Sequence, residues 1–161
     1  MFKPAWHVAG TIFGAAAVIG SVAVVRSGDS ASPAHRPVPS ESQIRDLDIQ
    51  FYQQRVVRDQ FSARDFTQLA GLYLQRARET ADNADLVRAE ENARHSLSLR
   101  VGRNEAALGI LASSLLSQHR FVEARHAARR LVAYDSTSIA ARGLLAETEF
   151  ELGRYAAAGR M

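Results

Sequence analysis

The sequence contains no cysteine, and its only four prolines all precede residue 41. Without cysteine the chain has no disulfide framework, no thiol nucleophile and no cysteine-ligated zinc. It also lacks a glycine-rich phosphate loop and the Gly-x-Ser-x-Gly turn of many hydrolases. We therefore expect no catalytic residues and no cofactor, and we expect uninterrupted helices after the last proline.

A large excess of one charge is also missing from most of the chain. The net charge is +3 and the pI is about 9.8, values that would suggest nucleic-acid binding. Three basic residues and one acidic residue lie in the first forty, which leaves 17 basic and 16 acidic residues and a net charge of +1 for the rest. Charges of both signs near neutrality are typical of a solvated surface, so nucleic acid is not an expected partner.

Clusters of metal-binding or catalytic side chains are not apparent either. No two of the five histidines have the spacing of a helical metal site, and no His-Glu-x-x-His motif occurs. The neighbouring carboxylates are expected to lie on solvated helix faces: Glu90, Glu91, Glu147, Glu149 and Glu151. The sequence therefore predicts no metal site.

Residues 5–25 form a long apolar stretch that begins after Lys3 and ends at Arg26. As a helix it reaches roughly the 30 Å of a bilayer core. It is either an uncleaved signal anchor within residues 1–26 or a signal peptide cleaved near Ala23. Cleavage there is an option because Ser21 and Ala23 are the small residues that a signal peptidase needs. Residues 27–42, rich in serine and proline, predict a flexible linker. Both alternatives place the rest of the chain outside the cytoplasm, on the membrane or in the periplasm.

A repeat follows. Leu111-Ala112 recurs 34 residues later as Leu145-Ala146, and the same step relates Phe121 to Tyr155 and Ala124 to Ala158. His119 and Gly153 precede the aromatic residue of each copy. At this position we predict a turn with a left-handed backbone, which glycine adopts freely and histidine tolerates better than most residues.

An earlier copy contains the pattern Phe66-x2-Leu69-Ala70-x2-Tyr73, followed by Ala89-x3-Ala93 on the next predicted helix. This pattern resembles the tetratricopeptide repeat, in which small residues let paired helices approach closely. The resemblance implies an all-α fold, an α-solenoid of antiparallel helix-turn-helix repeats that form a superhelix. The hydrophobic helix within residues 1–26 is expected to precede this solenoid.

The predicted repeat domain covers residues 43–161. It has a leading helix at 43–60, with Ser42 as a candidate cap, and copies at about 63–101, 104–137 and 138–161, the last one truncated. The leading helix is expected to pack through Ile44, Leu47, Phe51, Tyr52 and Val56. About seven extra residues near 79–85 predict either two lengthened helices or a polar loop. Arg142 and Glu149 replace apolar residues in the last copy and suggest a polar outer face.

In the resembling family, the first helices of the repeats line a concave groove that binds a partner. The resemblance implies that a protein or peptide binds here along Arg64, Thr67, Gly71, Leu74, Gln75, Ser113, Leu116, Ser117, Glu147, Phe150 and Glu151. Leu74, Leu116 and Phe150 would form an apolar ledge suited to a peptide. The alternative is that Leu116 and Phe150 simply pack within the domain.

These observations predict a non-catalytic, membrane-tethered scaffold that binds a protein partner. The alternative is a sensor or docking segment of a larger enzyme that continues after Met161. Self-association, through the anchor and the open end of the stack, is a further prediction.

Overall fold

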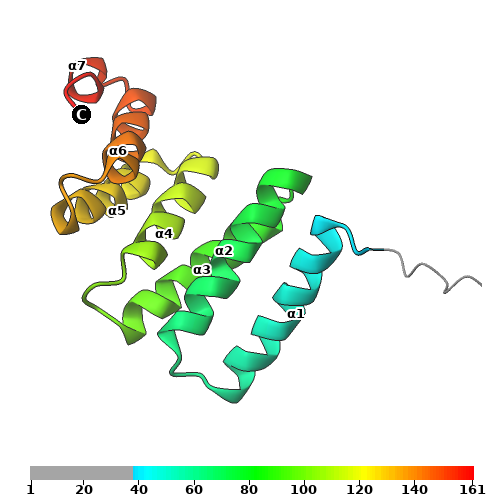
Figure 1. Ribbon diagram of the computed structural model, residues 1–161. Helices are drawn as coiled ribbons and strands as arrows, with labels where there is room; N and C mark the ends of the chain where they lie inside the picture. Colours follow the sequence, from blue (N-terminus) through cyan, green and yellow to red (C-terminus); the bar gives the residue numbers. More distant parts are fainter. Residues whose placement is uncertain (1–37) are drawn as a thin grey trace, which may run out of the picture. The chain divides into compact units, whose positions relative to one another are not determined.

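The computed structural model describes residues 38–161, and all regular secondary structure in this part is helical (Figure 1). The helices are α1 (Glu41–Arg58), α2 (Ala63–Thr80), α3 (Asn83–Leu99), α4 (Glu105–Ser117), α5 (Phe121–Tyr134), α6 (Ile139–Glu151) and α7 (Tyr155–Ala158). The predicted all-α class is confirmed for these residues. None of these helices has the length and hydropathy required to cross a bilayer. The predicted anchor, residues 1–26, and most of the predicted linker lie outside the described residues.

Helix α1 begins with a capping box, in which side chain and backbone satisfy each other's donors. The backbone N–H of Gln43 donates to Ser40 Oγ (3.2 Å), and the backbone N–H of Ser40 donates to Gln43 Oε1 (2.9 Å). The predicted cap at Ser42 is therefore wrong. Ser42 lies in the first turn of the helix, and its hydroxyl contacts that of Ser40.

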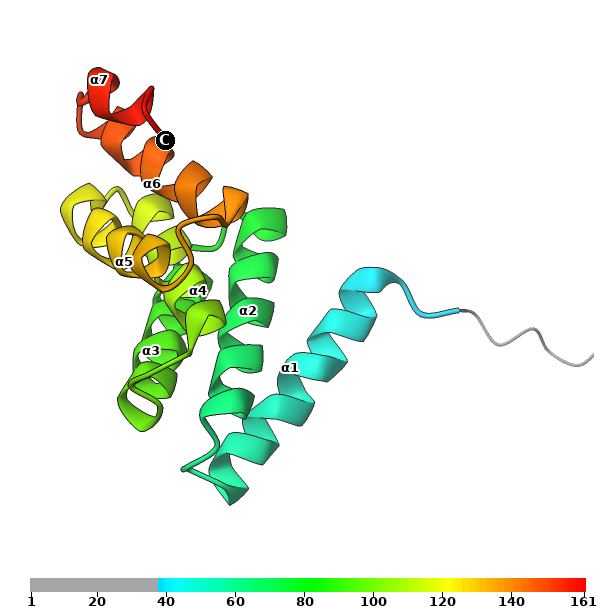
Figure 2. The ribbon, with the colours of Figure 1, turned by 60° about the vertical axis from the view of Figure 1, so that its left-hand side comes forward.

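Each helix contacts the next one along the chain, and α4 also contacts both α2 and α6 (Figures 1 and 2). The first helices of consecutive pairs therefore lie side by side. By contrast, the second helices α3 and α5 do not contact each other among the described helices. The three helices α2, α4 and α6 thus share one side of the helical region.

The extra residues of the first pair lengthen both of its helices. Helices α2 and α3 have 18 and 17 residues, whereas α4 and α5 have 13 and 14. The turn between α2 and α3 is short: Ala81 has a left-handed backbone (φ 58°), and Asp82 caps α3 by accepting from the N–H of Ala84 at 2.8 Å. Of the two predicted alternatives, the lengthened helices are correct.

Small residues lie where paired helices approach each other. Ala70, Ala89, Ala112 and Ala124 are fully buried, and Ala146 is half-buried. One apolar cluster surrounds α4 and includes Leu108, Leu111, Leu115, Leu145 and three alanines of α5: Ala124, Ala127 and Ala128. A second lies between α1, α2 and α3 and includes Ile49, Leu69, Tyr73, Leu74, Ala77 and Leu86.

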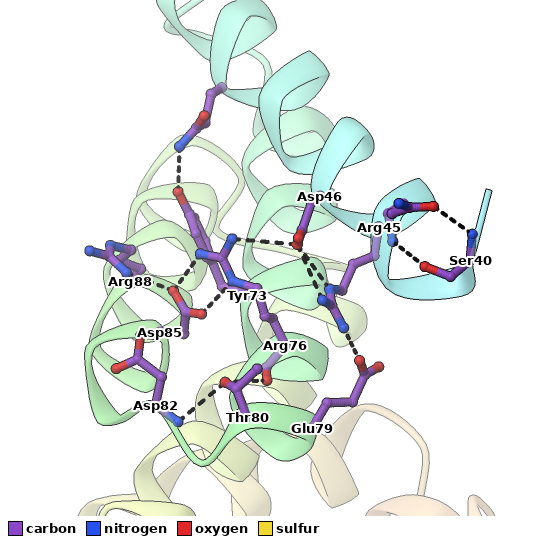
Figure 3. Close-up of polar contacts among 12 residues, drawn as sticks. Ser40, Arg45, Asp46, Tyr73, Arg76, Glu79, Thr80, Asp82, Asp85 and Arg88 are labelled. Atoms are coloured by element: carbon purple, nitrogen blue, oxygen red, sulfur yellow. Dashed lines mark hydrogen bonds and ion pairs between the residues drawn. The ribbon is translucent and has the colours of Figure 1, made fainter.

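Helix α1 packs through only part of the predicted face. Ile49 is buried, together with Arg45, and Tyr52 and Val56 pack beside it. Ile44, Leu47 and Phe51 are about half exposed, and this part of the prediction is wrong. The reason is that Arg45 is directed toward α2, where it pairs with Glu79 (Figure 3).

Ion pairs around the buried Asp85 join α2 to α3 beside the second cluster (Figure 3). Asp85 of α3 is buried and accepts hydrogen bonds from Arg76 Nε (2.5 Å), Arg76 Nη2 (2.8 Å) and Arg88 Nη1 (2.7 Å). Both guanidinium groups also lie over the ring of Tyr73. The hydrogen bonds from Arg76 hold the pKa of Asp85 below its ordinary value, although burial opposes the shift.

Two carboxylates expected on solvated faces are also buried. Glu90 accepts from Arg94 Nε (2.8 Å), Gln118 Nε2 (3.0 Å) and Arg120 Nη1 (2.6 Å), and thereby joins α3 to the turn after α4. Glu149 of α6 accepts from Arg125 Nε of α5 at 2.6 Å. The predicted polar outer face of α6 is therefore wrong at Glu149, because this carboxylate faces arginines of the preceding helix. Arg125 lowers the pKa of Glu149.

Candidate interaction groove

A cavity of about 320 Å³ is lined by residues of α2, α4 and α6 and by the residues that follow α4. We call it the α4/α6 cavity. Its lining comprises Arg78 of α2, Ser113, Leu116 and Ser117 of α4, His119 and Phe121 after α4, and Leu144, Glu147 and Glu151 of α6. Five of the predicted groove residues thus come together in one place.

The wall formed by His119 and Phe121 depends on the turn that ends α4. The backbone N–H of His119 donates to Leu116 O (3.0 Å) and that of Arg120 to Leu115 O (2.9 Å). This geometry requires a left-handed residue, and His119 has φ 59°. Gly153 occupies the equivalent position after α6 with φ 72°, so the predicted left-handed turns are confirmed. The His119 ring meets that of Phe121 edge to face at 5.6 Å.

The α4/α6 cavity combines an apolar surface with separated charges. Leu116, Leu144 and Phe121 are half-buried and provide the apolar part. Glu147 and Glu151 lie four residues apart on α6, whereas Arg78 approaches from α2. Such a cavity can hold an apolar side chain next to a basic group. Within residues 38–161, no three histidine or acidic side chains gather as metal ligands would.

A second pocket, of about 300 Å³, lies at the beginning of α2 and α4. We call it the arginine pocket. Its lining comprises Ala63, Arg64, Thr67 and Gln68 of α2, Arg100 and Arg103 of the α3–α4 connection, and Asn104, Glu105 and Ala106 at the start of α4. Arg103 has a left-handed backbone, with φ 51°.

The fully buried hydroxyl of Ser96 fixes the backbone beneath the arginine pocket. Ser96 Oγ donates to the carbonyl oxygen of Ala63 (2.7 Å) and lies 2.7 Å from Thr67 Oγ1. Asn104 Nδ2 donates to Ser96 Oγ (2.9 Å) and to Ser96 O (3.2 Å). One side chain therefore holds together the start of α2, the end of α3 and the start of α4.

The other predicted groove residues do not form the predicted ledge. Leu74 is buried in the second cluster, and Phe150 is exposed and stacks edge to face on Tyr155 at 5.2 Å. Leu74, Leu116 and Phe150 are therefore not one surface, because α2 turns Leu74 inward. Thr67 is also buried, and its hydroxyl donates to Ala63 O.

Two further predicted residues lie outside both cavities. Gly71 is half-buried, and a Cβ atom there would come within 3.6 Å of Ile110 Cδ1. Gln75 is exposed and donates to Glu79 Oε1 at 3.1 Å. Sequence reasoning missed Arg78, Phe121 and Leu144 as cavity residues and Arg100 and Arg103 as pocket residues. The two arginines could have been found, because they flank Val101 and Gly102 in the short connection between the first two repeat copies.

Comparison of the chain with models of protein families gave no match, and a search of curated proteins gave no significant match. The described residues define a broad class only: an all-α protein of consecutive helix pairs, with two open cavities along its first helices.

Proposed function

We propose that this protein is a non-catalytic scaffold of the tetratricopeptide type, which binds a peptide segment of a partner protein along α2, α4 and α6. The observation that carries the proposal is the α4/α6 cavity, which combines apolar side chains with a pair of carboxylates. The contacts of α4 with both α2 and α6 support a solenoid, because first helices of successive repeats adjoin in that architecture.

The chemistry of the α4/α6 cavity indicates what the peptide carries. An apolar side chain fits against Leu116, Leu144 and Phe121, and a lysine or arginine next to it would face Glu147 and Glu151. Arg78 on the opposite side would repel a second basic residue. We further propose that the apolar stretch at residues 5–25 directs this domain to the outside of the cytoplasmic membrane.

Selection of peptides from a random library on the full chain, followed by affinity measurement, tests the peptide-binding role. Replacing Ser117 with tryptophan would fill the α4/α6 cavity from its exposed rim without disturbing the core. We expect Ser117→Trp to lower the affinity for the selected peptides by about tenfold or more, because roughly one good contact would be lost.

The matched control is Ser98→Trp, at an exposed position of α3 outside both cavities. It should leave the affinity within about twofold. Equal affinity of Ser117→Trp and the unchanged protein for every selected peptide would reject the cavity as the binding site.

A further inference from the structure

The arginine pocket and the α4/α6 cavity open on the same side of the helices. Along α4, Ala106 borders the pocket, and Ser113 and Ser117 border the cavity, at steps of seven and eleven residues. These steps are close to two and three full turns of 3.6 residues. Along α2, Arg64 and Arg78 are 14 residues apart, close to four turns. One extended peptide can therefore reach both sites.

The arginine pocket holds positive charge that the protein itself does not neutralise. Within residues 38–161, none of Arg64, Arg100 and Arg103 forms an ion pair, whereas all four buried carboxylates there are paired with other arginines: Asp65, Asp85, Glu90 and Glu149. The one carboxylate among the lining residues is Glu105. The three guanidinium groups are thus available to an anion from outside.

The start of α4 adds to this preference. Asn104 occupies the N-cap position, but its side chain binds Ser96 and makes no capping hydrogen bond to α4. The first backbone N–H groups of α4, next to Ala106 in the pocket wall, therefore lack a side-chain acceptor. Free N–H groups and the positive end of the helix dipole reinforce the arginines, which remain the main feature of the site.

We propose that the arginine pocket binds an acidic segment of the partner peptide, through one or two carboxylate side chains. This proposal rests on the proposed function and adds the partner's charge pattern: acidic residues at one end, and an apolar residue with a basic neighbour at the other. The peptide would therefore lie with its acidic end at the start of α4 and its apolar end near the end of α4. A nucleic acid fits less well, because Glu147 and Glu151 would repel the continuing phosphates.

The distance between the two sites fixes the spacing of the two peptide features. Ala106 and Ser117 are separated by eleven residues of helix, or about 16 Å at 1.5 Å per residue. An extended peptide covers this distance with about five residues, at 3.3 Å each.

The test uses two blocked synthetic peptides and the full chain. One peptide carries three glutamates, a spacer of about five small residues and a Leu-Lys end; the other carries glutamine in place of each glutamate. Affinity is measured by fluorescence anisotropy at low and high salt, and binding sites are mapped from backbone amide shifts. We expect the glutamate peptide to bind about tenfold more tightly at low salt, to lose this advantage at high salt, and to shift the amides of residues 100–107.

The pocket variant is Arg64→Gln, Arg100→Gln and Arg103→Gln together. The control combines Arg58→Gln, Arg130→Gln and Arg160→Gln, which change the net charge equally at exposed arginines outside the pocket. The pocket variant should lose about tenfold in affinity for the glutamate peptide, and the control should stay within about twofold.

Equal losses in both variants, or equal binding of both peptides, would overturn the acidic-segment proposal. Tighter pocket-dependent binding of a single-stranded oligonucleotide than of the glutamate peptide would also overturn it. If the two peptides bind with equal affinity but Ser117→Trp still weakens their binding, only the arginine pocket's role is rejected. If glutamate-dependent binding persists unchanged in Ser117→Trp, only the α4/α6 cavity's role is rejected.

Discussion

The α2–α3 and α4–α5 pairs follow one plan but are held together by different forces. Between α4 and α5, leucines such as Leu108 and Leu115 pack against Ala124 and Ala128, and the contact is apolar. The longer α2–α3 pair adds Asp85 and its two arginines, which lie beside the buried ring of Tyr73. The comparison indicates that ion pairs, and not a larger apolar core, hold the additional length of α2 against that of α3.

This difference in forces implies a difference in response to pH. Apolar burial does not depend on protonation, whereas a buried carboxylate stabilises the fold only while it is ionised. Substitutions in the two pairs should therefore differ in how their effect on the free energy of unfolding changes between neutral and acid pH.

The largest effect is expected from Ala112→Leu in the apolar pair. Ala112 is fully buried in the cluster around α4, so three added carbon atoms have no space. We expect a loss of roughly 1–3 kcal/mol or more in the free energy of unfolding, measured with urea and unchanged between pH 7 and pH 4.

Ala133→Leu, at an exposed position of α5, is the matched control and should change stability by less than about 0.5 kcal/mol. If Ala112→Leu is as neutral as this control, α4 does not approach its neighbours as closely as described.

A smaller, pH-dependent effect is expected from Asp85→Asn in the α2–α3 pair. At pH 7 we expect a loss of about 1–2 kcal/mol, because Arg76 and Arg88 lose their ionised partner but keep access to water. Arg76 holds the folded-state pKa of Asp85 below its ordinary value of 3.8, so the stabilisation is present above that pH. It disappears as the pH falls through the lowered pKa.

The difference between the unchanged protein and Asp85→Asn should therefore shrink below about pH 4, while the difference for Ala112→Leu persists. Urea unfolding at a series of pH values measures both. A cost of Asp85→Asn that stays constant down to pH 3 would show that the charge of Asp85 is not what stabilises the pair.

The smallest effect is expected at the turn of the longer pair, from Ala81→Gly. Ala81 adopts φ 58°, a conformation that costs an alanine about 1 kcal/mol and a glycine almost nothing. We expect a gain of about 0.5 kcal/mol, visible as a slightly higher Tm.

Gly153→Ala is the reverse change at the turn after α6, where φ is 72°, and it should lower stability by a similar amount. A lower Tm for Ala81→Gly would mean that the flexibility of glycine in the unfolded chain outweighs the relief of strain.

Much of the helical arrangement could be predicted because it depends on local pattern. The spacing of Ala70, Ala112 and Ala124 marks close helix contacts, and the positions of His119 and Gly153 mark turns. The capping box at Ser40 and Gln43 was also readable from a serine followed by glutamine three residues later.

The remaining features depend on partners from other helices. Glu90 and Glu149 look like surface residues in the sequence, because their partners are distant in it: Arg120 comes from the turn after α4, and Arg125 from α5. Likewise, the buried face of α1 was misjudged because Arg45 is drawn inward by Glu79, 34 residues away. Of the groove residues implied by the resemblance, five line the α4/α6 cavity, Ser113 and Ser117 among them, but Phe121 and Arg78 reach it from other elements.

The hydroxyl of Ser96 has a consequence for the energetics of any guest in the arginine pocket. It contacts Ala63, Thr67 and Asn104 at once, so the start of α2, the end of α3 and the start of α4 are linked to one another without a guest. The helix ends around the pocket would then need no ordering, and each guanidinium side chain that binding orders would cost about 0.5–1.5 kcal/mol. A pocket prepared in this way would lose little entropy on association, while its three arginines set its preference for anions.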